Sequence, residues 1–103
     1  MERSREILRL WRNLTTETLW IWILKLLSKR PMHAYVLRNE LSSFGFSPSR
    51  ITCYKVLYLL QFRGYVKSRK LGRRRYYYLT KKGREELRKA IKLIKEVEEK
   101  LKS

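Results

Sequence analysis

The sequence predicts a mainly helical fold that carries one small β-hairpin. Apolar residues recur at helical spacing in five segments. Two short runs rich in aromatic and β-branched residues flank Gly72, which is typical of a hairpin. A chain of 103 residues has room for one modest core. We therefore expect a single domain over 1–103, with a compact core over 15–80 and a long helix over 81–103.

Two helices are predicted in the N-terminal third of the chain. In residues 2–13 the apolar side chains recur at spacings of three and four, which indicates an amphipathic helix. Thr15 or Thr16 is placed to cap a second helix, which we expect to run to about Lys29. Pro31 ends this helix, because the residue before a proline is pushed out of the helical region.

Two further helices are predicted on either side of a break at SSFGFSPS. The third runs from Met32 to about residue 42, and its candidate core residues are Tyr35, Val36, Leu37 and Leu41. Ser47 is a suitable N-cap and Pro48 suits the first helical position, so the fourth helix is predicted over 48–63. Gly64 then supplies the left-handed residue that commonly follows a helix.

The hairpin is predicted from residues 65–70 and 75–79, joined by 71–74. Because side chains alternate along a strand, Tyr77 and Leu79 share one face, which we expect to pack inward. Three compact helices followed by a hairpin is the order of a winged helix-turn-helix, a DNA-binding fold.

The last helix, predicted over 81–101 with Thr80 as its cap, repeats apolar residues at heptad spacing. Its stripe consists of Leu87, Ala90, Ile91, Ile94, Val97 and Leu101. This pattern is typical of a short coiled-coil seam. We expect a second copy of the chain to cover it, and the residues predicted at that interface are Leu8, Trp11, Trp20, Leu87, Ile91, Ile94, Val97 and Leu101.

The distribution of charge predicts a polyanionic partner. The formal net charge is +17, the sequence contains no aspartate, and no acidic residue occurs between Glu40 and Glu85. Twelve lysines and arginines lie in that interval. Such a segment repels itself unless an anion neutralises it, so double-stranded DNA is the expected partner. The alternative is a basic face that is merely solvated.

The fourth helix has one face suited to the core and one suited to a ligand. A helical wheel groups Ser49, Cys53, Val56, Leu57 and Leu60 on the core side. The residues of its start that we expect in the major groove are Ser47, Ser49, Arg50, Thr52 and Lys55. Ile51, Tyr58, Leu59 and Phe62 make the outer side apolar, so we expect another helix or subunit to cover its later turns.

The hairpin is expected to lie along the DNA backbone or in the minor groove, with residues 70–76 as the contacting segment. Arginines at its tip suit phosphates, and the tyrosines behind them anchor the strand. The predicted DNA-binding residues of this part of the chain are Lys67, Arg69, Lys70, Arg73, Arg74, Arg75 and Lys81.

The composition argues against an enzyme, a metal site and a cofactor. His33 is the only histidine and Cys53 the only cysteine, so neither a metal cluster nor a nucleophile with its base can be assembled. One cysteine suits a reducing cytosol, and we expect a cytoplasmic, nucleoid-associated protein. The apolar run LWIWILKLL has nine residues, too few to cross a bilayer, so no membrane partner is expected.

Three stretches resemble motifs of the PadR family of transcriptional regulators. They are LKLLSKRPMHAYVL (24–37), CYKVLYLLQFRGYV (53–66) and RRRYYYLTKKGREEL (73–87). The matching residues are Leu24, Leu27, Pro31, His33, Tyr35, Tyr54, Leu57, Leu60, Gly64, Tyr77, Leu79, Thr80, Gly83 and Leu87. Ala34 stands where the family usually has glycine.

The resemblance implies a homodimeric regulator, of the short kind that lacks a large C-terminal domain. Some short members bind flat aromatic effectors between tryptophans at the dimer centre. The tryptophans here are Trp11, Trp20 and Trp22, for which burial in a dimer core is the favoured alternative.

The predicted function is therefore a sequence-specific DNA-binding regulator, a homodimeric repressor that inserts helix 48–63 into the major groove. One alternative is an architectural protein that binds DNA with little regard to sequence. A second alternative is a protein–protein adaptor that uses the apolar stripe of the last helix, which leaves the acid-free interval unexplained.

Overall fold

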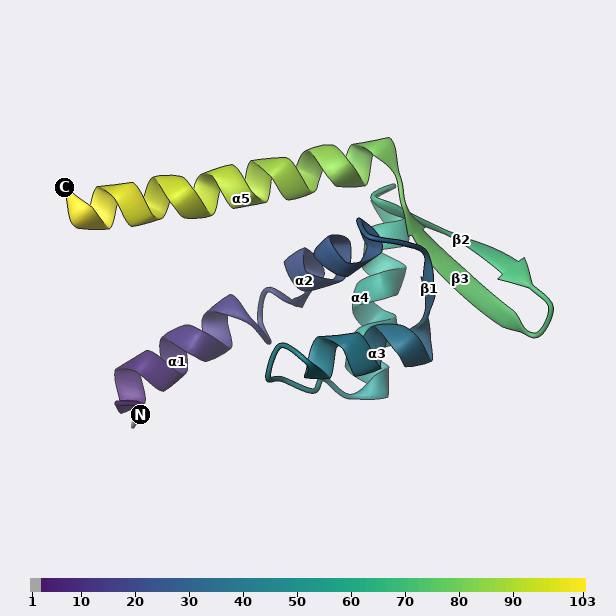
Figure 1. The fold of residues 1–103 in the computed structure, drawn as a ribbon, viewed down its shortest axis with the longest axis horizontal. Helices are drawn as coiled ribbons and strands as arrows, with labels where there is room; N and C mark the ends of the chain where they lie inside the picture. The colour runs from purple at the N-terminus through teal and green to yellow at the C-terminus, as the bar shows by residue number, and fades with distance from the viewer. Residues whose placement is uncertain (1–2) are drawn as a thin grey trace.

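A computed structural model of the chain describes residues 3–103 and contains five helices and three strands in this part of it. Their order along the chain is α1 (Arg5–Leu14), α2 (Leu19–Leu27), β1 (Met32–His33), α3 (Ala34–Ser42), α4 (Arg50–Phe62), β2 (Val66–Leu71), β3 (Arg74–Leu79) and α5 (Lys81–Lys102). Figure 1 shows β2 and β3 projecting from the helices as a ribbon, which we call the wing. The mainly helical fold with a small sheet agrees with the prediction.

The core forms around α2, which contacts α3, α4, α5 and the sheet. Its sequence is apolar on almost every side, as expected of a helix enclosed by other elements. Ile23, Leu24 and Leu26 are fully buried, and Leu37 of α3 and Cys53 of α4 meet them. The burial of Cys53, Leu57 and Leu60 confirms the predicted core face of α4, although Ser49 is exposed.

The sheet has three strands in the order β1-β3-β2, one more than the hairpin that was predicted. The third helix was expected to include Met32, but Met32 pairs with Tyr77 and His33 pairs with Tyr76 in β1. The reason is burial, because the extended backbone turns the Met32 side chain into the core, where it is 1% exposed. Tyr77 and Leu79 point inward as predicted.

The start of α4 differs from the prediction by two residues. Ser49, rather than Ser47, is the N-cap: its hydroxyl accepts a hydrogen bond from the Thr52 backbone N–H at 3.1 Å and donates one to the Thr52 hydroxyl at 2.9 Å. Pro48 is buried just before the cap, so it anchors the entering chain instead of opening the helix. Both serines have suitable side chains, and the burial of the proline decides between them.

The second helix also begins later than predicted, at Leu19. Thr15 does not cap it, because its hydroxyl donates to the carbonyl oxygen of Trp11 at 2.7 Å and so closes the end of α1. The indole N–H of Trp22 donates to the carbonyl oxygen of Leu14 at 2.9 Å. The second bond attaches the end of α1 to α2.

One joint connects the end of α4, the wing and the start of α5. Gly64 has a φ of +82°, as predicted for the residue that ends α4. The Thr80 hydroxyl donates toward the carbonyl oxygens of Gly64 and Tyr65, and accepts from the Gly83 backbone N–H at 3.0 Å. Gly83 lies so close to Tyr65 that an added Cβ would stand 2.2 Å from its carbonyl oxygen.

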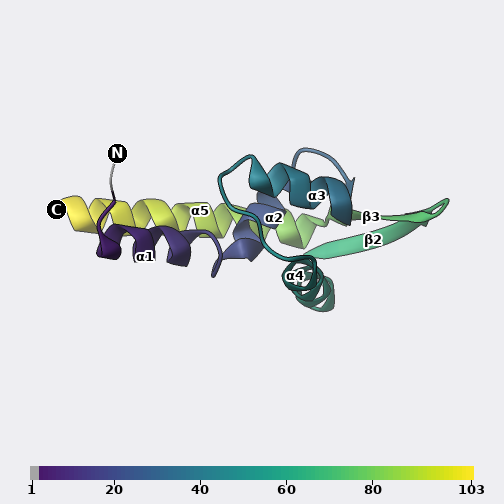
Figure 2. The same ribbon diagram turned by 90° about the horizontal axis from the view of Figure 1, so that it is seen from below.

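The molecule is elongated, with extents of 50 × 28 × 20 Å. The wing projects at one end, while α1 and the last turns of α5 extend at the other (Figures 1 and 2). We call the N-terminal half of α4 together with the wing the cationic end, and α1 together with residues 91–102 of α5 the helical end. Among residues 3–103, no helix is both long enough and apolar enough to span a bilayer.

Candidate nucleic-acid interface

The start of α4 presents two cations to solvent. Arg50 and Lys55 are exposed, whereas Cys53 and Leu57 hold the opposite face of the helix in the core. The cap formed by Ser49 fixes the first turn, so the backbone that carries Arg50 is ordered by its own hydrogen bonds. The side chains of this helix end are therefore carried on a rigid support.

The wing holds its arginines in two different ways. Arg74 lies 3.2 Å from the imidazole Nε2 of His33, because β1 pairs with β3 and brings His33 beside Tyr76. Arg75 donates to the Ser68 hydroxyl at 3.0 Å across the hairpin. Arg73 occupies the two-residue turn at the tip, between Leu71 and Arg74.

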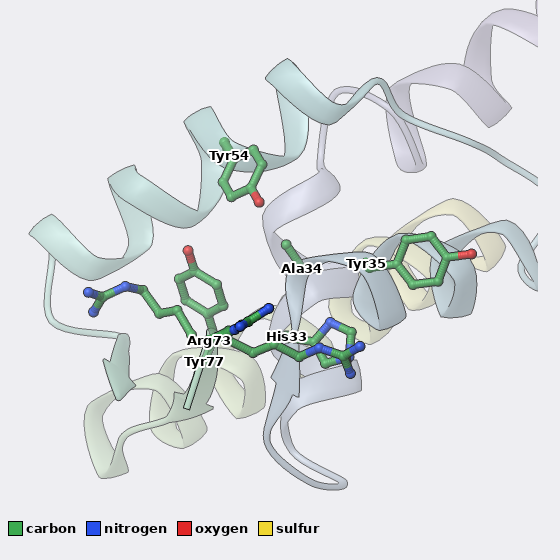
Figure 3. Close-up of a pocket in the computed structure, with 8 residues that line it drawn as sticks. His33, Ala34, Tyr35, Tyr54, Arg73 and Tyr77 are labelled. Carbon is green, nitrogen blue, oxygen red and sulfur yellow. The ribbon is translucent and has the colours of Figure 1, made fainter. Parts of the chain in front are cut away.

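A groove of about 500 Å³ separates the wing from α3 and α4. Its lining residues are His33, Ala34, Tyr35, Tyr54, Arg73, Arg74, Arg75 and Tyr77. Figure 3 shows Tyr54 descending from α4 and Tyr77 rising from β3 with their hydroxyls in the space between these elements, while Tyr35 points away along α3. The groove thus combines guanidinium groups with phenolic hydroxyls, which together suit a phosphate backbone.

Among residues 3–103, no acidic side chain forms an ion pair with this surface. In the part of the chain that the structure describes, the ion pairs are Arg30 with Glu40 at 3.4 Å and Lys102 with Glu98 at 3.5 Å, and neither reaches residues 41–84. The cations of α4 and the wing are therefore free to pair with an external anion.

Tyr77 of the groove and the buried Cys53 of α4 stay neutral. Burial raises the pKa of Tyr77 above its ordinary value, and the neighbouring Tyr54 raises it further while Arg75 opposes the change. Burial likewise raises the pKa of the Cys53 thiol, with Arg38 acting in the opposite direction. The charge of the groove therefore comes from its arginines.

The predicted DNA-contacting residues fall into two groups. Ser47, Ser49, Arg50, Lys55, Lys67, Arg69, Lys70, Arg73, Arg74, Arg75 and Lys81 are exposed, and Thr52 is half-buried. Most of them gather on α4 and the wing. Lys81 lies beyond the joint at the other end of α4, a helix of 13 residues that is about 20 Å long. Its contact with DNA stays a prediction, as do the contacts of the whole set.

Five residues that line the groove were not predicted as site residues: His33, Ala34, Tyr35, Tyr54 and Tyr77. Tyr35 was assigned to the core, but it is 68% exposed and stacks beside His33 with ring centres 6.4 Å apart. Tyr54 is 47% exposed and faces the wing. His33 and Tyr35 were missed because β1 was not predicted: a strand of two residues has too few side chains to show alternation.

The residues predicted at a dimer interface differ in their surroundings. Leu8, Ile91, Ile94, Val97 and Leu101 are exposed, whereas Leu87 is 8% exposed and packs into the core of its own chain. The first turns of α5 therefore pack into the core of their own chain, and the apolar stripe of α5 is exposed only after Ala90. Trp20 packs against the core, and Trp22 packs against Phe44 with ring centres 5.0 Å apart.

Comparison with known proteins places these features in a family. A sequence profile of the transcriptional regulator PadR-like family matches residues 23–89, which include α3, α4, the wing and the start of α5. The chain belongs to the PadR-like family of transcriptional regulators. The resemblance noted from the three motifs is thereby confirmed. No curated protein sequence matches the chain.

Solved structures share the fold over most of the chain. A PadR family regulator of Eggerthella lenta superposes with a TM-score of 0.81 at 23% identity, over 92% of this chain and 88% of that chain. A PadR-like regulator of Bacillus cereus gives a TM-score of 0.74 at 25% identity, covering 84% and 89%. Bacillus subtilis PadR, solved in complex with operator DNA, gives 0.65 at 24% identity, covering 72% and 47%.

Proposed function

We propose that this PadR-like protein is a homodimeric repressor that binds double-stranded DNA at a specific, pseudo-palindromic operator. In this proposal the start of α4 enters the major groove and the wing follows the backbone or the minor groove. The single observation that carries it is the cationic end, where Arg50, Lys55 and the arginines of the wing are exposed and form no ion pair with an acid of residues 3–103. The family membership and the operator complex of the Bacillus subtilis relative support the same partner.

The proposed dimer forms through the helical end. Apart from the half-buried Trp11, the apolar side chains of α1 and of α5 after Ala90 are about half exposed or more, for example Ile91 at 54% and Val97 at 48%. A stripe of this length on a soluble regulator indicates an interface with another chain. The proposed operator requires the two copies of α4 to lie about 34 Å apart, which is the spacing of successive major grooves on one side of a duplex.

Selection from a random pool of duplexes, followed by footprinting, tests this function. A regulator enriches one sequence with two symmetric half-sites and prefers it about 10³-fold or more over random DNA. An architectural protein, the remaining alternative, would retain duplexes without a common motif. Failure to retain any duplex would contradict both functions.

A further inference from the structure

The outer face of α4 carries an apolar hollow that the phosphate-binding role does not use. Arg50, Ile51, Tyr54, Lys55 and Tyr58 line this space of about 420 Å³. Ile51 is 68% exposed and Tyr58 is 70% exposed. Because Cys53 and its neighbours hold the other face in the core, Ile51 points almost directly away from the protein.

The position of Ile51 makes this exposure informative. Single apolar residues on a surface are ordinary. Ile51, however, follows Arg50 in the first turn of α4, the part of the helix that approaches base edges in the proposed complex. A side chain without a donor or acceptor recognises only an apolar group there. The 5-methyl group of thymine is the one apolar group on the major-groove edge of a base pair.

The remaining side chains of α4 narrow the choice of bases further. Its sequence, RITCYKVLYLLQF, contains no acid to accept from cytosine, and its single amide, Gln61, is half-buried in the last turn. The Thr52 hydroxyl already accepts a hydrogen bond from Ser49. Arg50 and Lys55 suit guanine, so the helix start offers groups for guanine and for thymine.

We propose that Ile51, supported by the rings of Tyr54 and Tyr58, is a specificity-determining residue that reads thymine methyl groups in the major groove. The proposal rests on the DNA-binding function above. In this proposal the thymine methyl group occupies the apolar hollow. Arg50 and Lys55, on either side of the hollow, would bind a neighbouring guanine or a phosphate.

Replacement of thymine by deoxyuridine tests the proposal, because it removes the methyl group and keeps every hydrogen-bonding group. Starting from an enriched duplex, each thymine is replaced in turn and the dissociation constant is measured by fluorescence anisotropy at fixed salt. We expect about a fourfold loss of affinity for each contacted methyl group, and about a fifteenfold loss when both half-sites are changed.

Two variants assign the effect to the proposed residue. Ile51→Ala should weaken binding to the thymine duplex and bind the thymine and deoxyuridine duplexes equally. Phe62→Ala is the matched control, since Phe62 lies on the same outer side about three turns later and is 79% exposed. This control should keep the full difference between the two duplexes. Neither change removes a core side chain, so both variants should fold.

The outcomes separate this proposal from the DNA-binding function. Equal affinity of the unaltered protein for thymine and deoxyuridine duplexes at every position would overturn the methyl recognition while leaving DNA binding intact. An Ile51→Ala variant that keeps the difference would overturn the role of Ile51. If neither deoxyuridine nor Ile51→Ala changed the affinity, the apolar face would be better explained as a binding site for a protein partner. If selection from the random pool enriched no duplex, both proposals would be overturned.

Discussion

At the cationic end the start of α4 and the wing expose arginines and lysines, whereas at the helical end α1 and the last turns of α5 expose leucines, isoleucines and a valine among their charged residues. α1 has no buried residue, and α5 has none after Ala90. Both kinds of exposure are unfavourable in an isolated chain, the first through repulsion and the second through contact of apolar groups with water. The comparison supports the two partners proposed above, a polyanion at one end and a second copy of the chain at the other.

Removal of the apolar stripe of α5 should have the largest effect. In the double variant Ile94→Gln and Val97→Gln, four apolar side chains are lost from a two-fold interface, at about 1.5 kcal/mol or more each. The dimer dissociation constant should rise by about 10⁴-fold or more, as measured by analytical ultracentrifugation. Lys92→Gln, on the opposite face of α5, is the control and should leave it unchanged. A double variant that stays dimeric would place the interface elsewhere.

Loss of the wing arginines should have the next largest effect. Replacing Arg73, Arg74 and Arg75 together with glutamine removes six proposed phosphate contacts from a dimer. Affinity should fall by about 10³-fold for the operator and for random duplexes alike, and the dependence of log K on log salt should become shallower by about 5. Circular dichroism should show an unchanged fold. A loss confined to one sequence would mean that the wing reads bases instead.

The joint between the two ends should tolerate no side chain at Gly83. The Cβ of Gly83→Ala would stand 2.2 Å from the Tyr65 carbonyl oxygen and 2.6 Å from the Leu79 Cδ1 atom. We expect a loss of about 1–3 kcal/mol in the free energy of unfolding, measured by urea titration. Arg84→Ala, the exposed neighbour on α5, should change it by less than about 0.5 kcal/mol. Equal stability of the two variants would show that α5 can shift away from the wing.

The cap of α4 should have the smallest effect. Ser49→Ala removes the hydroxyl that accepts from the Thr52 N–H and should cost about 1 kcal/mol. Ser47→Ala is the matched control two residues earlier and should cost almost nothing. Thermal unfolding of the two variants decides between the caps. A greater loss in Ser47→Ala would restore the helix start predicted from the sequence.

Periodicity and charge predicted much of this molecule. The inward pair Tyr77 and Leu79, the left-handed residue Gly64 and the core face of α4 follow from local rules of alternation and helix geometry. The prediction missed β1 because Met32 and His33 become a strand only by pairing with β3, which lies more than forty residues away. This long-range pairing is also why the His33 and Tyr35 side chains of the groove were not recognised.

The surroundings of Leu87 show a second limit of sequence reasoning. A heptad stripe records which side of α5 is apolar, but it does not record where the core of the same chain ends. Leu87 and Ala90 are buried within their own chain, and the exposed part of the stripe begins at Ile91. Only tertiary packing sets that boundary, so the heptad pattern could not show that Leu87 packs into the core of its own chain.

The salt dependence of binding to the selected duplex tests the central claim most directly. The cationic end of each of two chains is proposed to meet at least three phosphates, so log K should fall with log salt with a slope of about −5 or steeper. Titration should also give two chains per duplex. A flat salt dependence, or binding of a single chain without a preferred sequence, would contradict the account.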